Sequence, residues 1–154
     1  MDVHEQLRDE RVEANVRSEL FRDGRLDPRE VAVSVERGTV TLRGTVGSPA
    51  QKHAAEEAAT RADGVAGVRN ELEVVLLDLH LRRDAELRGQ VLQTLADNPL
   101  TPRTLDAQVS DGIVTLHGTV RDMFQRDEAE LVVHGVEGVR NVHNELGIAS
   151  GSSE

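Results

Sequence analysis

One nine-residue stretch occurs twice in this chain, at a fixed distance of 74 residues. Residues 38–46 read GTVTLRGTV, and residues 112–120 read GIVTLHGTV. A near-copy at a fixed shift is the signature of a duplicated module. The 154 residues therefore divide into two related modules, each close to the lower size limit for independent stability.

Alternating apolar residues predict a hairpin at the start of each sheet. In the first copy, valines alternate with other residues over 31–35, and Val40 and Leu42 continue the pattern after a turn. Two such runs joined by a glycine-containing turn predict a β-hairpin. In the second copy the turn is Asp111-Gly112, a pair in which both residues tolerate positive φ.

A third run of alternating apolar residues follows in both copies. It extends from Val68 to Leu76 in the first copy and from Val142 to Ile148 in the second. We expect this run to form the third strand of each sheet.

Each copy also contains two predicted helices. Val12, Val16 and Leu20 are spaced as on the buried stripe of a surface helix. The second helix is predicted to begin at Ser48-Pro49, a capping residue followed by a proline. Each half therefore reads helix, strand, strand, helix, strand.

The two copies correspond at two slightly different shifts. In the first helix Val12 matches Leu87, at 75 residues, whereas the match from Leu26 and Leu100 onward is at 74 residues. We therefore expect the second copy to have lost one residue in the loop before Leu100.

The repeat sets the expected domain boundaries. Residues 10–77 form the first module and residues 84–149 the second, with a short apolar linker at 78–83 and a polar tail at 150–154. At the end of the first module, the residues expected on the outward face of the third strand become apolar. Two readings stay open, docking of the modules on each other and an exposed patch for a partner, and both use Val75, Leu77, Leu79 and Leu81.

Charge and composition exclude several classes of partner. Asp and Glu outnumber Lys and Arg by 28 to 18, and a net charge of −10 repels nucleic acids. There is no cysteine, which excludes disulfides and thiolate metal sites. The longest apolar run, Val74 to Leu77, is too short to span a membrane. The first residues do not resemble a signal peptide, which predicts a cytoplasmic protein as the sequence stands and a periplasmic or envelope protein if a leader was removed.

The repeated strand and the end of each copy together resemble a known family. After the strand motif Gly-x-Val-x-Leu-x-Gly-x-Val, the copies end in GVAGVRNEL over 64–72 and GVRNVHNEL over 138–146. These motifs and the element order resemble the BON domain (bacterial OsmY and nodulation). The resemblance covers residues 10–76 and 84–149.

The resemblance implies an α+β fold without catalytic residues. Each module is expected to be an α-β-β-α-β sandwich, a three-stranded mixed sheet with two helices on one face. Many members are secreted or membrane-associated, with a proposed role in attachment to phospholipid or cell-envelope surfaces. Chaperone-like action is reported for the OsmY type.

The outward face of the sheet holds the candidate ligand residues. In the first copy these are Thr39, Thr41, Arg43 and Arg69, which could hold a phosphate or lipid headgroup through charge-assisted hydrogen bonds. In the second copy His117 and His143 replace the two arginines, and a metal site there is a further interpretation. The alternatives are an ordinary polar sheet face or one covered by the other module, and the nearby carboxylates of Glu71 and Glu73 oppose anion binding.

Other repeated polar and glycine positions are expected to be structural. We interpret Gly44 and Gly118 as backbone positions that a Cβ would obstruct, and the alternative is close approach of the backbone to a ligand. Gly38 and Gly112, in the hairpin turns, are also expected to be structural. Asn70 and Asn144 lie in phase with the inward residues, and a buried amide needs hydrogen-bonding partners. We therefore expect each to tie the third strand to a neighbouring loop, and the alternative is contact with a ligand.

The sequence therefore predicts a non-catalytic, stress-related interaction module. It binds phospholipid or envelope surfaces, or protein partners, and needs no cofactor. The alternative is a soluble chaperone-like factor that holds unfolded clients through exposed apolar strand edges. Enzyme activity is the weakest reading, because no pair of residues stands out as an acid and a base.

Overall fold

The computed structural model describes residues 3–76 and 79–149, and the side chain of Leu79 is outside the description. The chain divides into two compact units, Met1–Leu77 and Asp78–Glu154. We call them module 1 and module 2 and describe each by itself.

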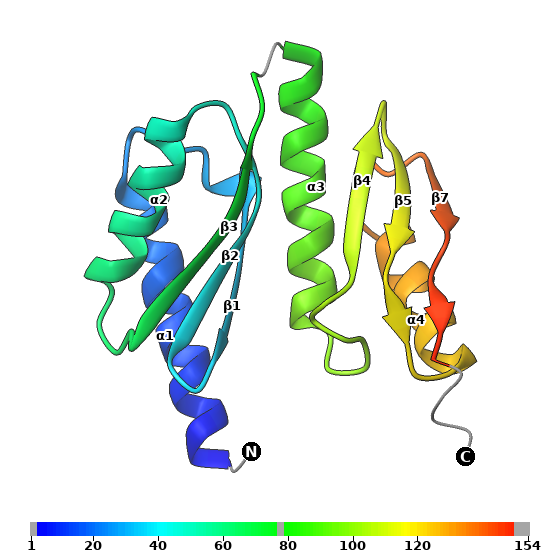
Figure 1. Ribbon diagram of the computed structural model, residues 1–154, viewed down its shortest axis with the longest axis horizontal. Helices are drawn as coiled ribbons and strands as arrows, with labels where there is room; N and C mark the ends of the chain where they lie inside the picture. The colour runs from blue at the N-terminus through cyan, green and yellow to red at the C-terminus, as the bar shows by residue number, and fades with distance from the viewer. Residues whose placement is uncertain (1–2, 77–78, 150–154) are drawn as a thin grey trace. The chain divides into compact units, whose positions relative to one another are not determined.

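The two modules share the order helix, strand, strand, helix, strand (Figure 1). Module 1 consists of α1 (Val3–Arg22), the 3-10 turn η1 (Pro28–Glu30), β1 (Val31–Glu36), β2 (Thr39–Val46), α2 (Pro49–Arg61) and β3 (Gly67–Val74). Module 2 consists of α3 (Leu79–Asp97), β4 (Asp106–Ser110), β5 (Ile113–His117), β6 (Thr119–Val120), α4 (Met123–His134), β7 (Asn141–Asn144) and β8 (Gly147–Ile148). The predicted order of helix, strand, strand, helix, strand is confirmed in both.

The repeated strand is the centre of each sheet. In module 1 the strand order is β1-β2-β3, with β2 antiparallel to β1 and parallel to β3. A parallel neighbour requires a crossover connection, and α2 supplies it. In module 2 the order is β4-β5-β7, and the short β6 and β8 pair beyond Gly118. The predicted mixed sheet with two helices on one face is confirmed (Figure 1).

The helix-facing residues of the sheet form the core of each module. Burial alternates along β2, where Val40, Leu42, Gly44 and Val46 are buried and the residues between them are half-buried. These side chains pack with Val16 and Leu20 of α1 and with the alanines of α2. Small residues let a helix approach a sheet closely, which explains the alanine-rich face of α2.

The third strand of module 1 is shorter than predicted. β3 ends at Val74, and Leu76, expected inside, is 87% exposed. The reason is that β2 ends at Val46, which pairs with Val74 and accepts one further hydrogen bond, 2.9 Å long, from the Val75 amide. Beyond that point β2 offers the chain no hydrogen-bonding partner.

Residues 79–83 of the predicted linker lie on a helix. α3 begins at Leu79, so residues 79–83 form its first turns and Leu81 lies on a helix rather than in a strand phase. Leu77 and the polar tail at 150–154 lie outside the described residues. Docking through the apolar run stays a prediction.

Both crossover helices begin with the predicted cap. The Gln51 amide donates to the Ser48 hydroxyl at 3.1 Å, and the Gln51 side chain accepts from the Gly47 amide at 2.8 Å. In module 2 the Gln125 amide donates to Asp122 at 3.0 Å, and the Gln125 side chain completes the same reciprocal pair. Such caps satisfy amides that the first helical turn leaves unpaired.

An asparagine fastens the third strand to the crossover helix in each module. The Asn70 amide nitrogen donates to the Lys52 carbonyl oxygen at 2.9 Å, and its oxygen accepts from the Leu72 amide at 3.2 Å. Asn144 repeats both bonds, at 3.1 Å in each case. The partner lies on a helix rather than in the expected loop.

We expect Asn70→Ala to lower the free energy of unfolding of module 1 by about 1–3 kcal/mol, because a half-buried carbonyl and an amide lose their partners. Urea denaturation followed by circular dichroism measures the change, with Asn144→Ala as the matched variant of module 2. An unchanged denaturation midpoint for Asn70→Ala would contradict this role.

Candidate functional site

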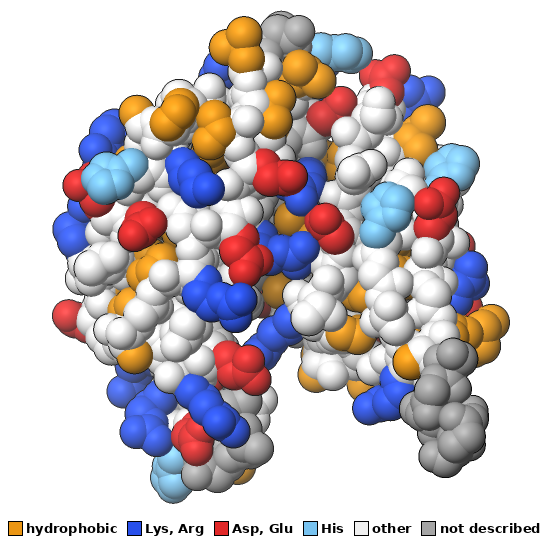
Figure 2. Space-filling model, viewed as in Figure 1, with side chains coloured by type: hydrophobic (Ala, Val, Ile, Leu, Met, Phe, Trp, Pro, Cys, Tyr) orange, Lys and Arg blue, Asp and Glu red, His pale blue; other side chains and the backbone are white. Residues whose placement is uncertain are grey.

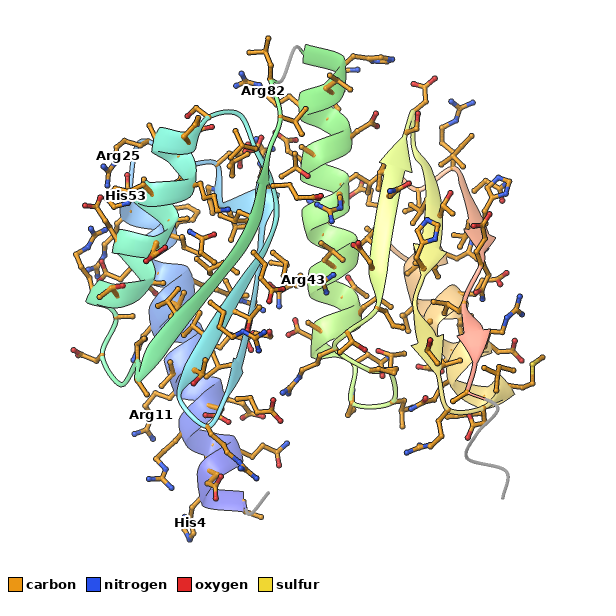
Figure 3. The ribbon with its side chains drawn as sticks, in the orientation of Figure 1. His4, Arg11, Arg25, Arg43, His53 and Arg82 are labelled. Atoms are coloured by element: carbon orange, nitrogen blue, oxygen red, sulfur yellow. The ribbon has the colours of Figure 1, made fainter. Side chains whose placement is uncertain are left out.

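The predicted ligand residues of module 1 lie on one face of its sheet. In the β2–β3 register Thr39 is opposite Gly67, Thr41 opposite Arg69, and Arg43 opposite Glu71. These residues therefore share the face that points away from α1 and α2, and Figure 3 shows the Arg43 side chain on that side.

A carboxylate lies between the two arginines of this face. Arg43 Nε is 4.0 Å from Glu71 Oε1, and Arg69 Nη2 is 3.4 Å from Glu71 Oε2. Figure 2 shows acidic and basic side chains side by side on the visible face of this module. An anion here competes with Glu71 for both guanidinium groups.

Module 2 keeps the pair of Arg43 and Glu71 with a histidine in place of the arginine. His117 Nδ1 is 3.8 Å from Glu145 Oε1, at the positions equivalent to Arg43 and Glu71. His143 is opposite Thr115 on the neighbouring strand, which makes it a diagonal neighbour of His117 on the same face. The structure thus brings the predicted residues together in each module, while ligand binding at this face stays a prediction.

The strand glycines serve the backbone. Gly44 has a φ of 137°, and a Cβ there would lie 2.0 Å from the carbonyl oxygen of Glu30. Gly118 has a φ of 132° and faces Leu105. The close neighbour is in each case the chain itself.

A groove that the sequence did not reveal lies at the other end of module 1. It has a volume of about 570 Å³ and lies between α1, the β1–β2 turn and the loop from α2 to β3. Its lining consists of Glu5, Arg8, Asp9, Arg11, Val12, Asn15, Arg37, Gly38, Asp63, Gly64 and Ala66. Figure 3 shows Arg11 extending from α1.

Module 2 has the same groove, with a volume of about 380 Å³. Its lining consists of His80, Arg83, Asp84, Glu86, Leu87, Gln90, Asp111, Gly112, Glu137, Gly138 and Arg140. Each of these residues is equivalent to one in module 1, at a shift of 75 in the first helix and 74 elsewhere. The groove is therefore a property of the repeated fold.

A buried aspartate organises the floor of the groove. Asp9 is 8% exposed, and its two carboxylate oxygens accept hydrogen bonds from the amides of Arg37 at 2.9 Å and Gly38 at 3.0 Å. Both turn residues have positive φ, 52° and 81°, a conformation that points successive amides at one acceptor. In module 2, Asp84 accepts from the Asp111 amide at 3.0 Å.

The charges of the rim differ between the modules. In module 1 Glu5 on the helix is 3.8 Å from Arg37 on the turn, whereas in module 2 His80 on the helix is 3.2 Å from Asp111 on the turn. Glu86 likewise replaces Arg11. Module 1 therefore has three guanidinium groups around its groove, and module 2 has carboxylates at two of those positions.

Sequence reasoning missed the groove because its lining comes from three separate segments. One signal was present. The pairs Arg8 with Arg83 and Asp9 with Asp84 are identical at the shift of 75. Asp9 is in phase with the buried stripe of Val12, Val16 and Leu20, and a carboxylate at such a position requires hydrogen-bonding partners.

An ion network closes the turn after α1. Arg25 Nη2 is 2.7 Å from Asp23 Oδ2 and 3.1 Å from Glu57 Oε1, and Arg61 Nη2 is 3.6 Å from Asp23 (Figure 3 labels Arg25). The Arg25 amide also donates to Asp23 Oδ1 at 3.0 Å. The hydrogen bond from the Arg25 side chain has the largest effect on Asp23, followed by that from the Arg25 amide, and together they hold the pKa of Asp23 well below its usual range.

This lowered pKa predicts a pH-dependent effect of Asp23→Asn. The stabilisation by the carboxylate is complete above its unfolded-state pKa of about 4, and it is lost as the pH falls from there toward the folded-state value. We expect the substitution to lower the melting temperature of the protein at pH 7 and to have a smaller effect at about pH 2. Asn98 occupies the equivalent turn of module 2 and accepts the Leu100 amide at 2.8 Å, so asparagine fits the turn. Equal losses at both pH values would refute the ionic explanation.

Across the described ranges 3–76 and 79–149, no helix is both long and apolar enough to cross a membrane.

Two α-β-β-α-β modules with matching grooves define a duplicated α+β protein. The BON domain family matches this chain twice, over residues 8–75 and 83–150. The chain therefore belongs to the BON domain family.

A curated relative and two solved structures extend the comparison. The chain is similar to osmotically-inducible protein Y of Escherichia coli (strain K12), with 33% identity over 150 residues, which cover 90% of this chain and 71% of the relative. Two structures of CdsD, a structural protein of the type III secretion system of Chlamydia trachomatis, match 92% of this chain at 16% identity. The chain covers 67% and 63% of their lengths, with TM-scores of 0.33 and 0.35.

Proposed function

We propose that this protein is a non-catalytic binding protein of osmotic stress that attaches to phospholipid surfaces through the groove of module 1. The observation that carries the proposal is the set of three arginines around that groove, Arg8, Arg11 and Arg37. Membership of the BON domain family and the name of the Escherichia coli relative support the setting.

The chemistry of the groove suits a phosphate attached to an apolar group. Guanidinium groups bind phosphate through paired, charge-assisted hydrogen bonds. Apart from the carboxylate of Asp9, the floor between them is apolar or without a side chain, at Val12, Gly38, Gly64 and Ala66. A phosphate headgroup with the start of its acyl chains combines these two properties.

Charge limits the strength of this binding. Glu5 and Asp63 share the rim with the arginines, and the whole chain has a net charge of −10. We therefore expect weak binding to anionic vesicles that decreases further as salt screens the local attraction.

The groove supports binding rather than catalysis. Its most buried carboxylate, Asp9, is occupied by two turn amides. Among the described residues that line the two grooves there is no serine, threonine or cysteine to act as a nucleophile.

Vesicle co-sedimentation of the full chain tests the proposal. Phosphatidylcholine vesicles with and without phosphatidylglycerol are compared at low and high salt, and inorganic phosphate is added as a competitor to separate a free anion from a lipid. We expect binding to the phosphatidylglycerol vesicles that Arg8→Ala/Arg11→Ala abolishes. Arg83→Ala/Arg140→Ala, which removes two guanidinium groups from the groove of module 2, should leave that binding intact.

Two other outcomes would lead to a different functional assignment. If Arg43→Ala/Arg69→Ala removes vesicle binding and the groove variant does not, the contact surface is the open sheet face. If no vesicle is bound and the protein instead suppresses aggregation of an unfolded client, the chaperone-like alternative is correct.

A further inference from the structure

Module 2 has an apolar patch on the outer surface of α4. Leu131 is 68% exposed, Phe124 61%, Met123 55% and Leu100, on the turn after α3, 45%. Phe124 and Leu131 are seven residues apart and so lie on one face of the helix. The Asn98 side chain donates to Glu128 Oε2 at 3.0 Å, which holds the turn of Leu100 beside that face. We call these four residues the α4 patch.

Two of the four equivalent positions of module 1 have charged side chains. Arg25 and Glu57 form an ion pair of 3.1 Å there. Glu57 is equivalent to Leu131 at the shift of 74. Arg25 is equivalent to Leu100, because the amides of both donate to the side chain two residues earlier, Asp23 or Asn98. An ion pair in one module is thus replaced by two exposed leucines in the other.

This equivalence corrects the position of the lost residue. The loop of module 2 is shorter after Leu100, not before it, since the turn of residues 98–100 repeats that of residues 23–25. The side chain at this turn position is consequently free to differ without a change in the backbone.

The size of the α4 patch indicates a small partner. Four side chains of this kind, each about half exposed, present roughly 400 Å² of apolar surface, within the range of functional patches on monomers. A stable dimer needs about 800 Å² on each partner. The patch therefore fits a short segment better than a second folded copy.

The charges around the patch select the sign of the partner. Along α4 and the residue pair before it there are four carboxylates, of Asp122, Asp127, Glu128 and Glu130, against two guanidinium groups, of Arg121 and Arg126. Arg126 donates to the carbonyl oxygens of Asn144 and Leu146, and Arg121 Nε is 3.9 Å from Asp122 Oδ2, so the excess negative charge lies on Asp127, Glu128 and Glu130. Carboxylates around the patch repel a second copy and an anionic lipid surface, and they attract cations.

We propose that the α4 patch is a docking surface for a polypeptide segment that combines apolar side chains with Lys or Arg. The apolar side chains of the segment contact Phe124, Leu131 and Leu100, and its cationic side chains reach the carboxylates of α4. Docking through module 2 is separate from the lipid contact proposed for module 1.

Fluorescence anisotropy with dye-labelled peptides tests this surface on the full chain. The probes are three unstructured twelve-residue peptides, one rich in Leu and Lys, one in Leu and Glu, and one in Ser and Lys. We expect binding of the Leu/Lys peptide only. Leu100→Arg/Leu131→Glu installs the ion pair of module 1 and should raise the dissociation constant at least about ten-fold, as loss of a central apolar contact does.

Controls separate this result from misfolding and from the lipid contact. Leu76→Ser removes a leucine that is 87% exposed but outside the patch, and it should leave peptide binding unchanged. Thermal unfolding of the double variant should match the parent, because its new pair copies one that the fold already contains. The Arg8→Ala/Arg11→Ala variant should keep peptide binding whether or not it binds vesicles.

Three results would overturn the proposal. Equal binding of the Leu/Lys and Leu/Glu peptides, or of neither, would refute the charge-selected segment. Loss of vesicle binding in Leu100→Arg/Leu131→Glu would identify the patch as a lipid contact. A concentration-dependent dimer in sedimentation velocity that disappears in this variant would identify the occupant as a second copy.

Discussion

Replacing Gly44 by alanine is expected to destabilise module 1 by ~3 kcal/mol or more, because strained backbone and a backbone clash combine. The φ of 137° is one that side chains with a Cβ rarely adopt, and the new Cβ would lie 2.0 Å from the Glu30 carbonyl oxygen. That oxygen belongs to the backbone just before β1, so the edge of the sheet has to move.

Gly118→Ala and Gly67→Ala are the matched comparisons. At Gly118 the nearest atom is Leu105 Cδ2 at 2.9 Å, the end of a flexible side chain, so we expect a smaller loss of about 1–2 kcal/mol. At Gly67 the described residues leave open space within 4 Å, so alanine should be neutral. Hydrogen exchange followed by mass spectrometry on the full chain measures amide protection in each module separately. Equal protection in the Gly44 and Gly67 variants would contradict the account of Gly44.

The second large effect is expected for Asp9→Ala. It removes the acceptor of two turn amides, those of Arg37 and Gly38, and hydrogen bonds to a charged group contribute about 1.5–3 kcal/mol each. We expect a loss of about 3 kcal/mol in the stability of module 1, with the greatest loss of amide protection in the β1–β2 turn. Hydrogen exchange measures both quantities.

Asp84→Ala provides the comparison in module 2, where the structure shows the bond from the Asp111 amide. We expect about half the effect, because one amide rather than two loses its acceptor. Asp9→Asn keeps one acceptor oxygen and should fall between the parent and Asp9→Ala. If Asp9→Ala leaves turn protection unchanged, the carboxylate does not organise the groove.

Much of the fold could be predicted because strand alternation and helix capping depend on residues that are close in the sequence. The alternation in residues 31–43 and the cap at Ser48-Pro49 depend only on neighbours along the chain, and both predictions are confirmed. The end of β3 was misjudged because Leu76 continues the pattern, while the length of a strand also depends on its partner, which stops at Val46.

The candidate sites were harder to predict for the same reason. Thr41 and Arg69 could be placed on one face by counting residues, but the position of Glu71 between the two arginines depends on the register of a parallel pair. The groove forms where three separate segments meet. The α4 patch depends on Leu100 and Leu131 lying side by side, as Arg25 and Glu57 do in module 1. Such features depend on tertiary contacts that no single stretch encodes.

The duplication thus gives two copies of one scaffold with different surfaces. Module 1 has a groove with three arginines and a charged outer helix, and module 2 has a more acidic groove and an apolar outer helix. We infer that the copies have specialised, one for an anionic surface and the other for an apolar, cationic segment.

A charge-exchange experiment tests this specialisation most directly. Arg11→Glu/Arg37→Asp gives module 1 the carboxylates that module 2 has at these two positions. Adding Glu86→Arg/Asp111→Arg places arginines at the equivalent positions of module 2 and keeps the net charge of the parent, −10. A control adds the same charge to the first variant away from both grooves and both sheet faces, through Asp97→Arg/Asp127→Arg. Co-sedimentation with phosphatidylglycerol vesicles should be lost in the first variant, regained in the second and absent in the control. Equal binding by the second variant and the control would contradict the central claim, because net charge rather than the groove would then determine attachment.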